Sequence, residues 1–187
     1  MKITLLGDSI RLIGYGTKVP QLLGEDFEVF QPTDNCRYSK YTFRMIYEWQ
    51  EEMKGSRIVH WNNGIWDACL IPDRKPFSTE TEYVDTMLRI ADVLQKNHEK
   101  VIFATTTPVR EDAPNDDTKI IKAYNAAIVP KLMERGIVIN DLHTTVAKDV
   151  ERYIREDDKI HLTDAGIDVC AAQVAQMIKE EAKKLKR

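Results

Sequence analysis

The sequence predicts an α/β protein, a three-layer α/β/α sandwich around a mostly parallel, five-stranded sheet. Short apolar runs rich in β-branched and aromatic residues, typical of strands buried on both faces, alternate with longer amphipathic segments. Parallel strands need such helical crossovers between them. No repeat, Ser/Gly-rich linker or shift of composition divides the 187 residues, so we expect one domain spanning residues 1–187.

Five apolar runs are predicted as the strands of this sheet. Each is short and is followed by polar or turn-forming residues, as expected where a buried strand ends. In chain order they are Lys2–Leu6, Phe27–Phe30, Arg57–Trp61, Val101–Thr105 and Gly136–Ile139.

The segments between these strands carry apolar residues at steps of three and four, which indicates helices with one buried face. Gly136 follows one of them directly and is a plausible helix-ending glycine. The last helix becomes Lys-rich over Lys179–Arg187, a pattern typical of a solvated helix end. The predicted helices are Val19–Leu23, Lys40–Lys54, Glu80–Asn97, Thr118–Arg135 and Ala165–Leu185.

Composition excludes several classes of protein. A hydrophobic content of 43% is too high for a disordered chain. Lys and Arg number 27 against 30 Asp and Glu, and this near-neutral balance provides no basic surface for nucleic acid. No apolar run reaches the roughly 18 residues that would span a bilayer, so we expect no membrane association.

Cysteine usage and the start of the chain bear on its compartment. Cys36, Cys69 and Cys170 are odd in number, far apart and never spaced as CxxC, which argues against a disulfide framework and against a zinc site. Met1 leads straight into a predicted strand without the pattern of a signal peptide. We therefore expect a cytoplasmic protein.

The first candidate for chemistry follows the first strand. Ligands of parallel α/β sheets bind beyond the carboxyl ends of the strands, and Gly7-Asp8-Ser9 stands at such an end. The Ser9 hydroxyl is a potential nucleophile if a general base lies next to it. The alternative is that Ser9 only caps a helix.

The candidate base lies near the other end of the chain. His161 precedes the last helix, and Asp158 stands three residues earlier, close enough in a tight loop to bind the imidazole. A carboxylate in that position fixes the tautomer of a catalytic histidine and stabilises the imidazolium. The alternatives are a simple surface loop, or His143 as the base, with Asp141 as its carboxylate.

Gly7-Asp8-Ser9-Ile10 after the first strand, together with Asp158-x-x-His161, resembles the SGNH hydrolases, also known as GDSL esterases and lipases. The resemblance extends over nearly the whole chain. It implies a flavodoxin-like fold with Ser9 as nucleophile, His161 as base and then acid, and Asp158 as the orienting carboxylate. It also implies an oxyanion hole formed by the Ser9 amide, a glycine amide after the second strand and an asparagine side chain after the third.

Two departures from the family pattern concern that hole. No glycine stands between Asp34 and Ser39, so we predict that another backbone amide, that of Arg37, donates there. After the third strand Trp66 occupies the usual asparagine place, and two asparagines precede Gly64 instead. We predict Asn62 as the donor, with Asn63 as the alternative; the other asparagine would shape a turn with Gly64.

The sequence thus predicts a serine esterase that hydrolyses carboxylic esters through an acyl-enzyme at Ser9, with acetyl groups on carbohydrates as one substrate class. Its partner would be a small-molecule ester, and this chemistry needs no metal or other cofactor. Tyr38 and Trp66 would line a sugar or acyl pocket, or else simply pack. The alternatives are a non-catalytic flavodoxin-like module that binds a small anion at Gly7–Ile10, and an SGNH thioesterase or lysophospholipase.

Overall fold

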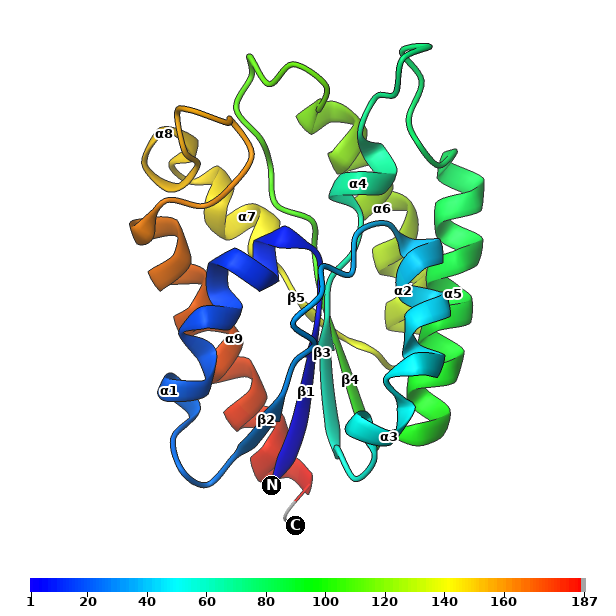
Figure 1. Ribbon diagram of the computed structural model, residues 1–187, viewed down its shortest axis with the longest axis vertical. Helices are drawn as coiled ribbons and strands as arrows, with labels where there is room; N and C mark the ends of the chain where they lie inside the picture. Colours follow the sequence, from blue (N-terminus) through cyan, green and yellow to red (C-terminus); the bar gives the residue numbers. More distant parts are fainter. Residues whose placement is uncertain (186–187) are drawn as a thin grey trace.

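A computed structural model describes residues 1–185 and contains one sheet of five parallel strands in the order β2-β1-β3-β4-β5 (Figure 1). The predicted sandwich with a five-stranded sheet is confirmed, and within the described residues every pairing between strands is parallel. The strands are β1 (Lys2–Leu6), β2 (Glu28–Phe30), β3 (Ile58–Trp61), β4 (Lys100–Ala104) and β5 (Val138–Asn140).

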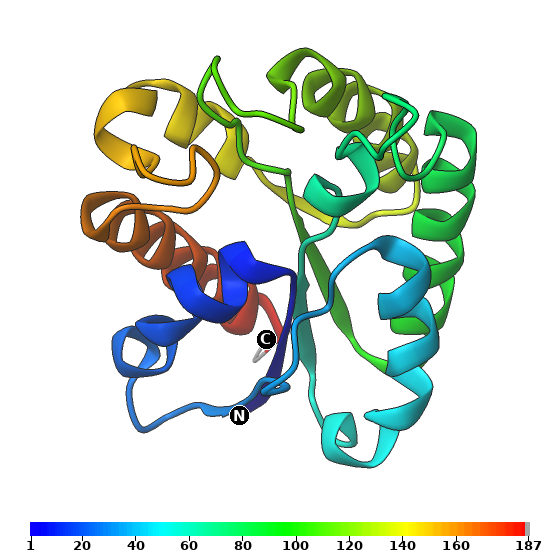
Figure 2. The same ribbon diagram turned by 45° about the horizontal axis from the view of Figure 1, so that its top comes forward.

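Helices cover both faces of the sheet, as Figures 1 and 2 show. One layer is formed by the long C-terminal helix and the shorter helices packed on it, namely α9 (Asp164–Leu185), α1 (Val19–Leu23), α7 (Leu142–Ala147) and α8 (Val150–Tyr153). The other layer consists of α2 (Ser39–Glu48), α3 (Gln50–Met53), α5 (Glu80–Asn97) and α6 (Thr118–Glu134). The one-turn helix α4 (Ile65–Ala68) follows β3 at the upper end of the sheet in Figure 1.

Most predicted boundaries agree with the structure within one or two residues, but three features differ. The predicted helix Lys40–Lys54 is broken at Trp49, where the backbone leaves helical geometry and the indole and Met53 turn into the core. The predicted buried strand Phe27–Phe30 is an edge strand in which Glu28 is exposed and Val29 and Phe30 are half-buried. The short helices α4, α7 and α8 carry too few residues to show a periodic pattern.

The sheet order brings the ends of β1 and β3 together. β1 lies between β2 and β3, and Leu6 pairs with Trp61 at their carboxyl ends. For this strand order, the β1/β3 junction is the point from which the crossovers leave in opposite directions, and ligands bind there. The residues that follow, Gly7-Asp8-Ser9 and Asn62-Asn63, therefore share one edge of the sheet.

Within residues 1–185, no helix is both long and apolar enough to cross a lipid bilayer. The predicted Lys-rich end of the last helix extends to residue 187, and residues 186–187 lie outside the described part of the chain.

Candidate active site

Ser9 begins the first helical turn after β1. It precedes the π-helical turn η1 (Ile10–Gly14), which continues into η2 (Tyr15–Thr17). Its hydroxyl makes no capping bond, so capping does not account for this serine. Within residues 1–185, the Ser9 amide also has no hydrogen-bond partner. Ser9 thus presents an unpaired hydroxyl and an unpaired amide at the carboxyl end of the sheet.

Gly7 is needed because the Asn62 side chain passes directly over it. A Cβ on residue 7 would lie 2.0 Å from Asn62 Oδ1. Asn62 Oδ1 in turn accepts a 2.6 Å hydrogen bond from the buried hydroxyl of Tyr15. The amide of Asn62 is therefore fixed against the turn that carries Ser9.

Asp8 places a buried carboxyl beneath the same turn. Burial raises the pKa of Asp8 to about 6, although the Asn62 side chain, the Ile10 amide and the charges of Arg11 and His161 oppose the effect. Asp8 Oδ1 accepts from the Ile10 amide at 2.9 Å, whereas Asp8 Oδ2 has no hydrogen-bond partner within the described residues. Asp8 thus holds the backbone of the Ser9 turn and lies beside the Asn62 side chain.

His161 and Asp158 form the pair that the sequence predicts. Asp158 Oδ2 lies 3.0 Å from His161 Nδ1, and Asp158 Oδ1 accepts from the amides of His161 at 2.8 Å and Ile160 at 2.9 Å. Burial acts to raise the pKa of Asp158, but these two amides and the imidazole outweigh it and lower that pKa. The carboxylate is thus held ionised and fixes the imidazole.

The loop that carries this pair is anchored at both ends. Ile154 and Leu162 form an antiparallel bridge, and the Arg155 amide donates to the His161 carbonyl at 2.8 Å. Gly166 packs so closely on Tyr153 that a Cβ there would lie 2.3 Å from the Tyr153 carbonyl oxygen. The start of α9 therefore holds His161 in a defined position.

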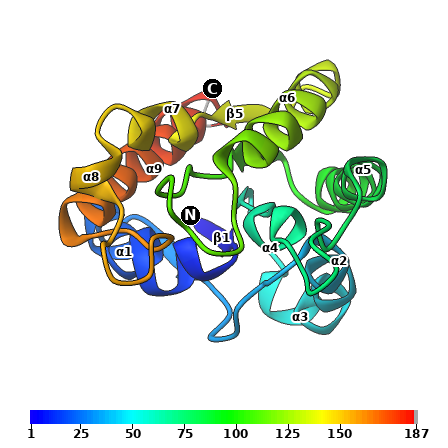
Figure 3. The ribbon, with the colours of Figure 1, turned by 90° about the horizontal axis from the view of Figure 1, so that it is seen from above.

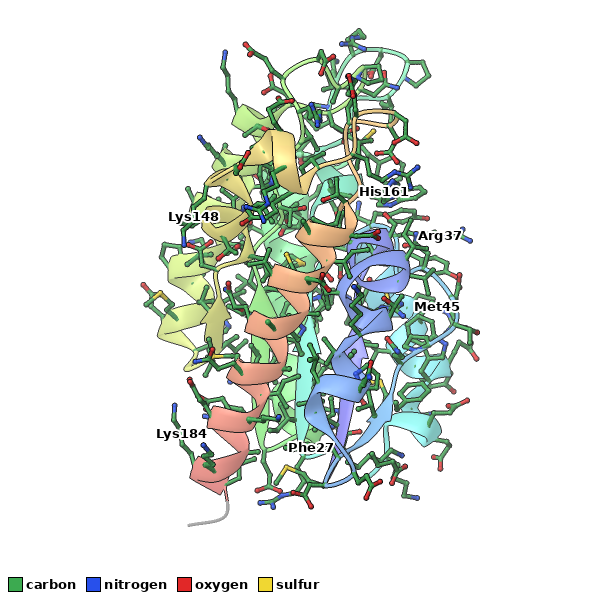
Figure 4. The ribbon with its side chains drawn as sticks, turned by 90° about the vertical axis from the view of Figure 1, so that its left-hand side faces the viewer. Phe27, Arg37, Met45, Lys148, His161 and Lys184 are labelled. Atoms are coloured by element: carbon green, nitrogen blue, oxygen red, sulfur yellow. The ribbon has the colours of Figure 1, made fainter. Side chains whose placement is uncertain are left out.

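Ser9 and His161 come together although 151 residues separate them in sequence (161 − 9 − 1). Both line a pocket of about 340 Å³ and also a second pocket of about 400 Å³. Figure 4 shows His161 just before the start of α9, at the end of the molecule opposite Lys184. No hydrogen bond joins Ser9 to His161 within the described residues, a common condition of catalytic pairs without substrate.

The two asparagines after β3 have different surroundings. Asn63 is fully buried; its Oδ1 accepts from Trp61 Nε1 and its Nδ2 donates to the Arg37 carbonyl, each at 2.9 Å. Asn62 contacts Tyr15, Gly7 and Asp8 instead. Both polar ends of the Asn63 side chain are therefore engaged in structural bonds, whereas Asn62 belongs to the Ser9 turn.

The predicted Arg37 amide is already engaged. It donates to Asn35 Oδ1 at 2.7 Å, in a turn where Arg37 adopts a positive φ of 49°. This amide would have to leave Asn35 before it could bind an oxyanion, so the geometry speaks against Arg37 as a donor. Of residues 35–39, only Tyr38 has an amide without a hydrogen-bond partner.

Arg11 organises this loop and was not singled out from the sequence. Its side chain is fully buried and donates to the carbonyls of Gly7 at 3.0 Å, Pro32 at 2.7 Å and Asp34 at 2.8 Å. A charged residue four positions after Gly7 in an otherwise apolar turn was the available signal. Arg11 thus ties the end of β1 to the loop after β2.

The structure separates the two predicted aromatic residues. Trp66 is 42% exposed and lines the 340 Å³ pocket with Ser9 and His161. Tyr38 instead packs on Phe77, with ring centroids 4.6 Å apart, and does not line that pocket. Of the two, only Trp66 is positioned to touch a molecule bound at Ser9.

Two other lining residues of this pocket, Asn35 and Ile65, lie in segments that directly follow predicted strands, where ligands are expected. Cys69, Asp116 and Ile160 also line the pocket and had no sequence signal.

His143, the alternative base, lies elsewhere. Its Nδ1 is 2.7 Å from the Thr106 carbonyl oxygen, and it lines a different pocket. Asp141 binds the amide and hydroxyl of Thr144 and the hydroxyl of Thr105 rather than the His143 ring. The geometry therefore favours His161 over His143.

Comparison of the sequence with protein-family models and with curated proteins gave no match. Solved structures do match over nearly the whole chain. A lipase/acylhydrolase from Enterococcus faecalis is 20% identical with a TM-score of 0.76, covering 96% of each chain. An acetyl xylan esterase is 19% identical with a TM-score of 0.75, covering 95% of this chain and 100% of the other.

An acetylxylan esterase from Geobacillus stearothermophilus, solved as a catalytic mutant, is 16% identical with a TM-score of 0.79, covering 94% of this chain and 92% of the other. A GDSL-like lipase from Bacteroides thetaiotaomicron is 17% identical with a TM-score of 0.72, covering 96% and 88%. The expected fold is thereby confirmed: this chain has the fold of the SGNH, or GDSL, hydrolases.

Proposed function

We propose that the protein is a serine esterase that hydrolyses carboxylic esters through an acyl-enzyme at Ser9. The observation that carries this proposal is the position of Ser9 and His161 on one pocket, with His161 Nδ1 held 3.0 Å from Asp158. An unpaired serine hydroxyl beside an oriented imidazole has the chemistry of a nucleophile with its general base.

Ser9 attacks the ester carbonyl while His161 Nε2 accepts the hydroxyl proton. Asp158 keeps the proton of His161 on Nδ1 and stabilises the imidazolium that forms. His161 then protonates the alcohol as it leaves, and the acyl group stays on Ser9. Water that gives its proton to His161 attacks the acyl-enzyme and releases the acid.

The oxyanion is bound by the Ser9 amide and Asn62 Nδ2. The Ser9 amide has no other partner within residues 1–185, and Tyr15 holds the oxygen of the Asn62 side chain. Asn62 Nδ2 carries two hydrogens, so it has one left for the oxyanion even when Asp8 accepts the other. Donors fixed before the reaction contribute about 2.7–4 kcal/mol each to such a step.

Acetyl esters of carbohydrates are the substrate class that we propose. The 340 Å³ pocket at Ser9 suits a small acyl group with part of its alcohol, and exposed Trp66 offers an aromatic surface to a sugar ring. Structural neighbours with this fold include acetylxylan esterases, and catalytic mutants of the Geobacillus enzyme replace a serine and a histidine with alanine.

The alternative function is binding of a small anion at Gly7–Ile10 without catalysis. This function does not explain the Asp158–His161 pair. Anion binding at the amides of that turn needs neither a base nor an orienting carboxylate. The Asp158–His161 pair, on the same pocket as Ser9, therefore favours the esterase.

The test is labelling with a fluorophosphonate, followed by mapping of the adduct, and hydrolysis of 4-nitrophenyl acetate. We expect the adduct on Ser9, and we expect Ser9→Ala to abolish both labelling and hydrolysis without lowering the melting temperature. Labelling of another residue, or retention of most activity by the purified variant, would contradict the proposal.

A further inference from the structure

The pocket at Ser9 contains a carboxyl group that the triad does not use. Asp116 lines it together with Trp66, Cys69 and His161, although it comes from the loop before α6. This loop follows β4 and lies over the carboxyl end of β1 in Figure 3. Asp116 is only 9% exposed, so most of its surface is withdrawn from water.

Asp116 has no partner that would account for its burial. Within residues 1–185, no ion pair includes Asp116, and no N–H or O–H group donates a hydrogen bond to it. Burial raises the pKa of Asp116, and only the Cys69 thiol, a weak donor, and the charge of His161 oppose this. The Asp116 carboxyl thus lines the pocket without a strong donor from the protein, and a bound ligand can supply one.

Asp116 also lines a second pocket, of about 670 Å³, which Ser9 does not line. Arg74, Lys119 and Lys122 are among its other lining residues. Asp116 is thus shared by the pocket at Ser9 and by a neighbouring pocket that carries charged side chains. Such a region suits a hydroxylated molecule better than a hydrocarbon chain.

The proton transfers of ester hydrolysis decide which half of the substrate meets Asp116. His161 protonates the leaving alcohol, so the alcohol oxygen lies against the imidazole. Asp116 lines the same pocket and interacts electrostatically with His161. A hydroxyl on the carbon adjacent to the one that bears the ester oxygen is then within the same pocket as the Asp116 carboxylate, which can accept its hydrogen bond.

We infer that Asp116 determines specificity for the alcohol half of the ester, by accepting hydrogen bonds from hydroxyl groups next to the scissile bond. The inference rests on the proposed esterase function and narrows its substrates to esters of polyhydroxylated alcohols. A cationic alcohol is the less suitable occupant because the Asn35 side chain and the polar second pocket offer donors as well as acceptors.

The experiment compares two acetates that differ in the hydroxyls of their alcohol, ethyl acetate and glycerol monoacetate, with wild type and Asp116→Asn. We expect the KM for glycerol monoacetate to rise about tenfold with kcat nearly unchanged, because the hydrogen bond forms in the ground state and in the transition state alike. Ethyl acetate and 4-nitrophenyl acetate should change less than about twofold.

Asp112→Asn is the matched control, since Asp112 stands on the same loop, is exposed, and pairs with Lys159 at the surface. This variant should have the same kcat and KM as the wild type for all three substrates. Asp116→Asn should fold with an equal or higher melting temperature, because it removes an unpaired buried charge. Asp116→Ala, which also removes the acceptor, should raise the KM for glycerol monoacetate further.

If Asp116→Asn lowered kcat/KM equally for ethyl acetate and glycerol monoacetate, or for neither, the role of Asp116 would be overturned. The proposed esterase function would be unaffected by that result. With acetylcholine as a fourth substrate, a loss of kcat/KM confined to that ester would show a site for cations and would also overturn the role of Asp116. Absence of hydrolysis of every ester by the wild-type protein would refute the esterase itself, and the inference with it.

Discussion

Two groups of polar residues at the same edge of the sheet differ in how their hydrogen bonds are used. Around Asp67 every donor is directed inward: this carboxylate accepts from the Ser39 amide at 2.8 Å and from the hydroxyls of Ser39 at 2.7 Å and Ser78 at 2.8 Å. Around Ser9 the hydroxyl and the amide remain unpaired. The first group holds loops together, and the second is left open for a ligand.

This difference separates residues that build the site from residues that act in it. Buried polar groups are normally satisfied, so an unpaired group beside a pocket marks a position where a ligand completes the bonding. Asn63 belongs to the structural group and Asn62 to the open one, although they are neighbours in sequence. The predictions below test this division.

The largest effects are expected for Ser9→Ala and His161→Ala. Loss of the base should lower kcat for 4-nitrophenyl acetate by on the order of 10⁴- to 10⁶-fold, nearly as much as Ser9→Ala. The double variant should lose little more than either single one, because the two side chains act as a unit. A His143→Ala variant that was inactive beside an active His161→Ala would show that the base had been assigned wrongly.

Asp158→Asn should lower kcat by about a hundredfold to ten-thousandfold, through the wrong tautomer and a less stable imidazolium. Because the pKa of Asp158 is lowered, its carboxylate stays ionised at neutral and mildly acidic pH. The ionised Asp158 carboxylate therefore adds to the free energy of unfolding above the ordinary pKa of 3.8. This stabilisation is lost as the pH falls through the lowered pKa of Asp158 in the folded protein.

Urea unfolding of wild type and Asp158→Asn across this range measures that contribution. The difference in unfolding free energy should not narrow between about pH 7 and pH 5, because Asp158 also stabilises protonated His161, and it should narrow below about pH 4. A difference that is already lost above about pH 5 would contradict the assigned direction of the pKa shift.

For Asn62→Ala we expect a kcat loss on the order of a hundredfold, with KM nearly unchanged, because the oxyanion exists only near the transition state. Tyr15→Phe is the matched variant, since it removes the 2.6 Å hydrogen bond that orients Asn62 but leaves the donor in place. Tyr15→Phe should lower kcat less than Asn62→Ala does. No loss in Asn62→Ala would mean that backbone amides form the hole alone.

The sequence predicted the residues that stand next to each other in short motifs. Ser9 follows a strand directly, and Asp158 and His161 are three positions apart, so the chain itself fixes their spacing. The strand order was predicted only as a class of fold, yet it brings Leu6 beside Trp61 and so Ser9 beside Asn62. The spacing of residues within a short motif can be read from the sequence, whereas contacts between distant loops depend on how the chain packs.

The residues that were missed share this dependence on packing. Arg11 binds carbonyls 21 and 23 positions away, and Asp116 meets Ser9 across more than a hundred residues. The Arg37 amide could be proposed from the family pattern, but only the turn at Asn35 shows that it is engaged. A backbone bond of this kind leaves no mark in a single sequence.

The smallest effect on catalysis is expected for Asn63→Ala. This variant removes a side chain that is engaged in structural hydrogen bonds and leaves the unpaired groups around Ser9 unchanged. Removal of the side chain leaves buried Trp61 Nε1 and the Arg37 carbonyl without a partner, which should lower the unfolding free energy by about 1–3 kcal/mol. The kcat for 4-nitrophenyl acetate should fall less than about threefold where the variant is folded, because the Asn63 side chain is fully buried and bonds to Trp61 and Arg37 rather than to the Ser9 turn. Urea unfolding and kinetics of Asn62→Ala and Asn63→Ala on one ester therefore give opposite patterns. A large kcat loss confined to Asn63→Ala would reverse the roles of the two asparagines and with them the division between open and engaged groups.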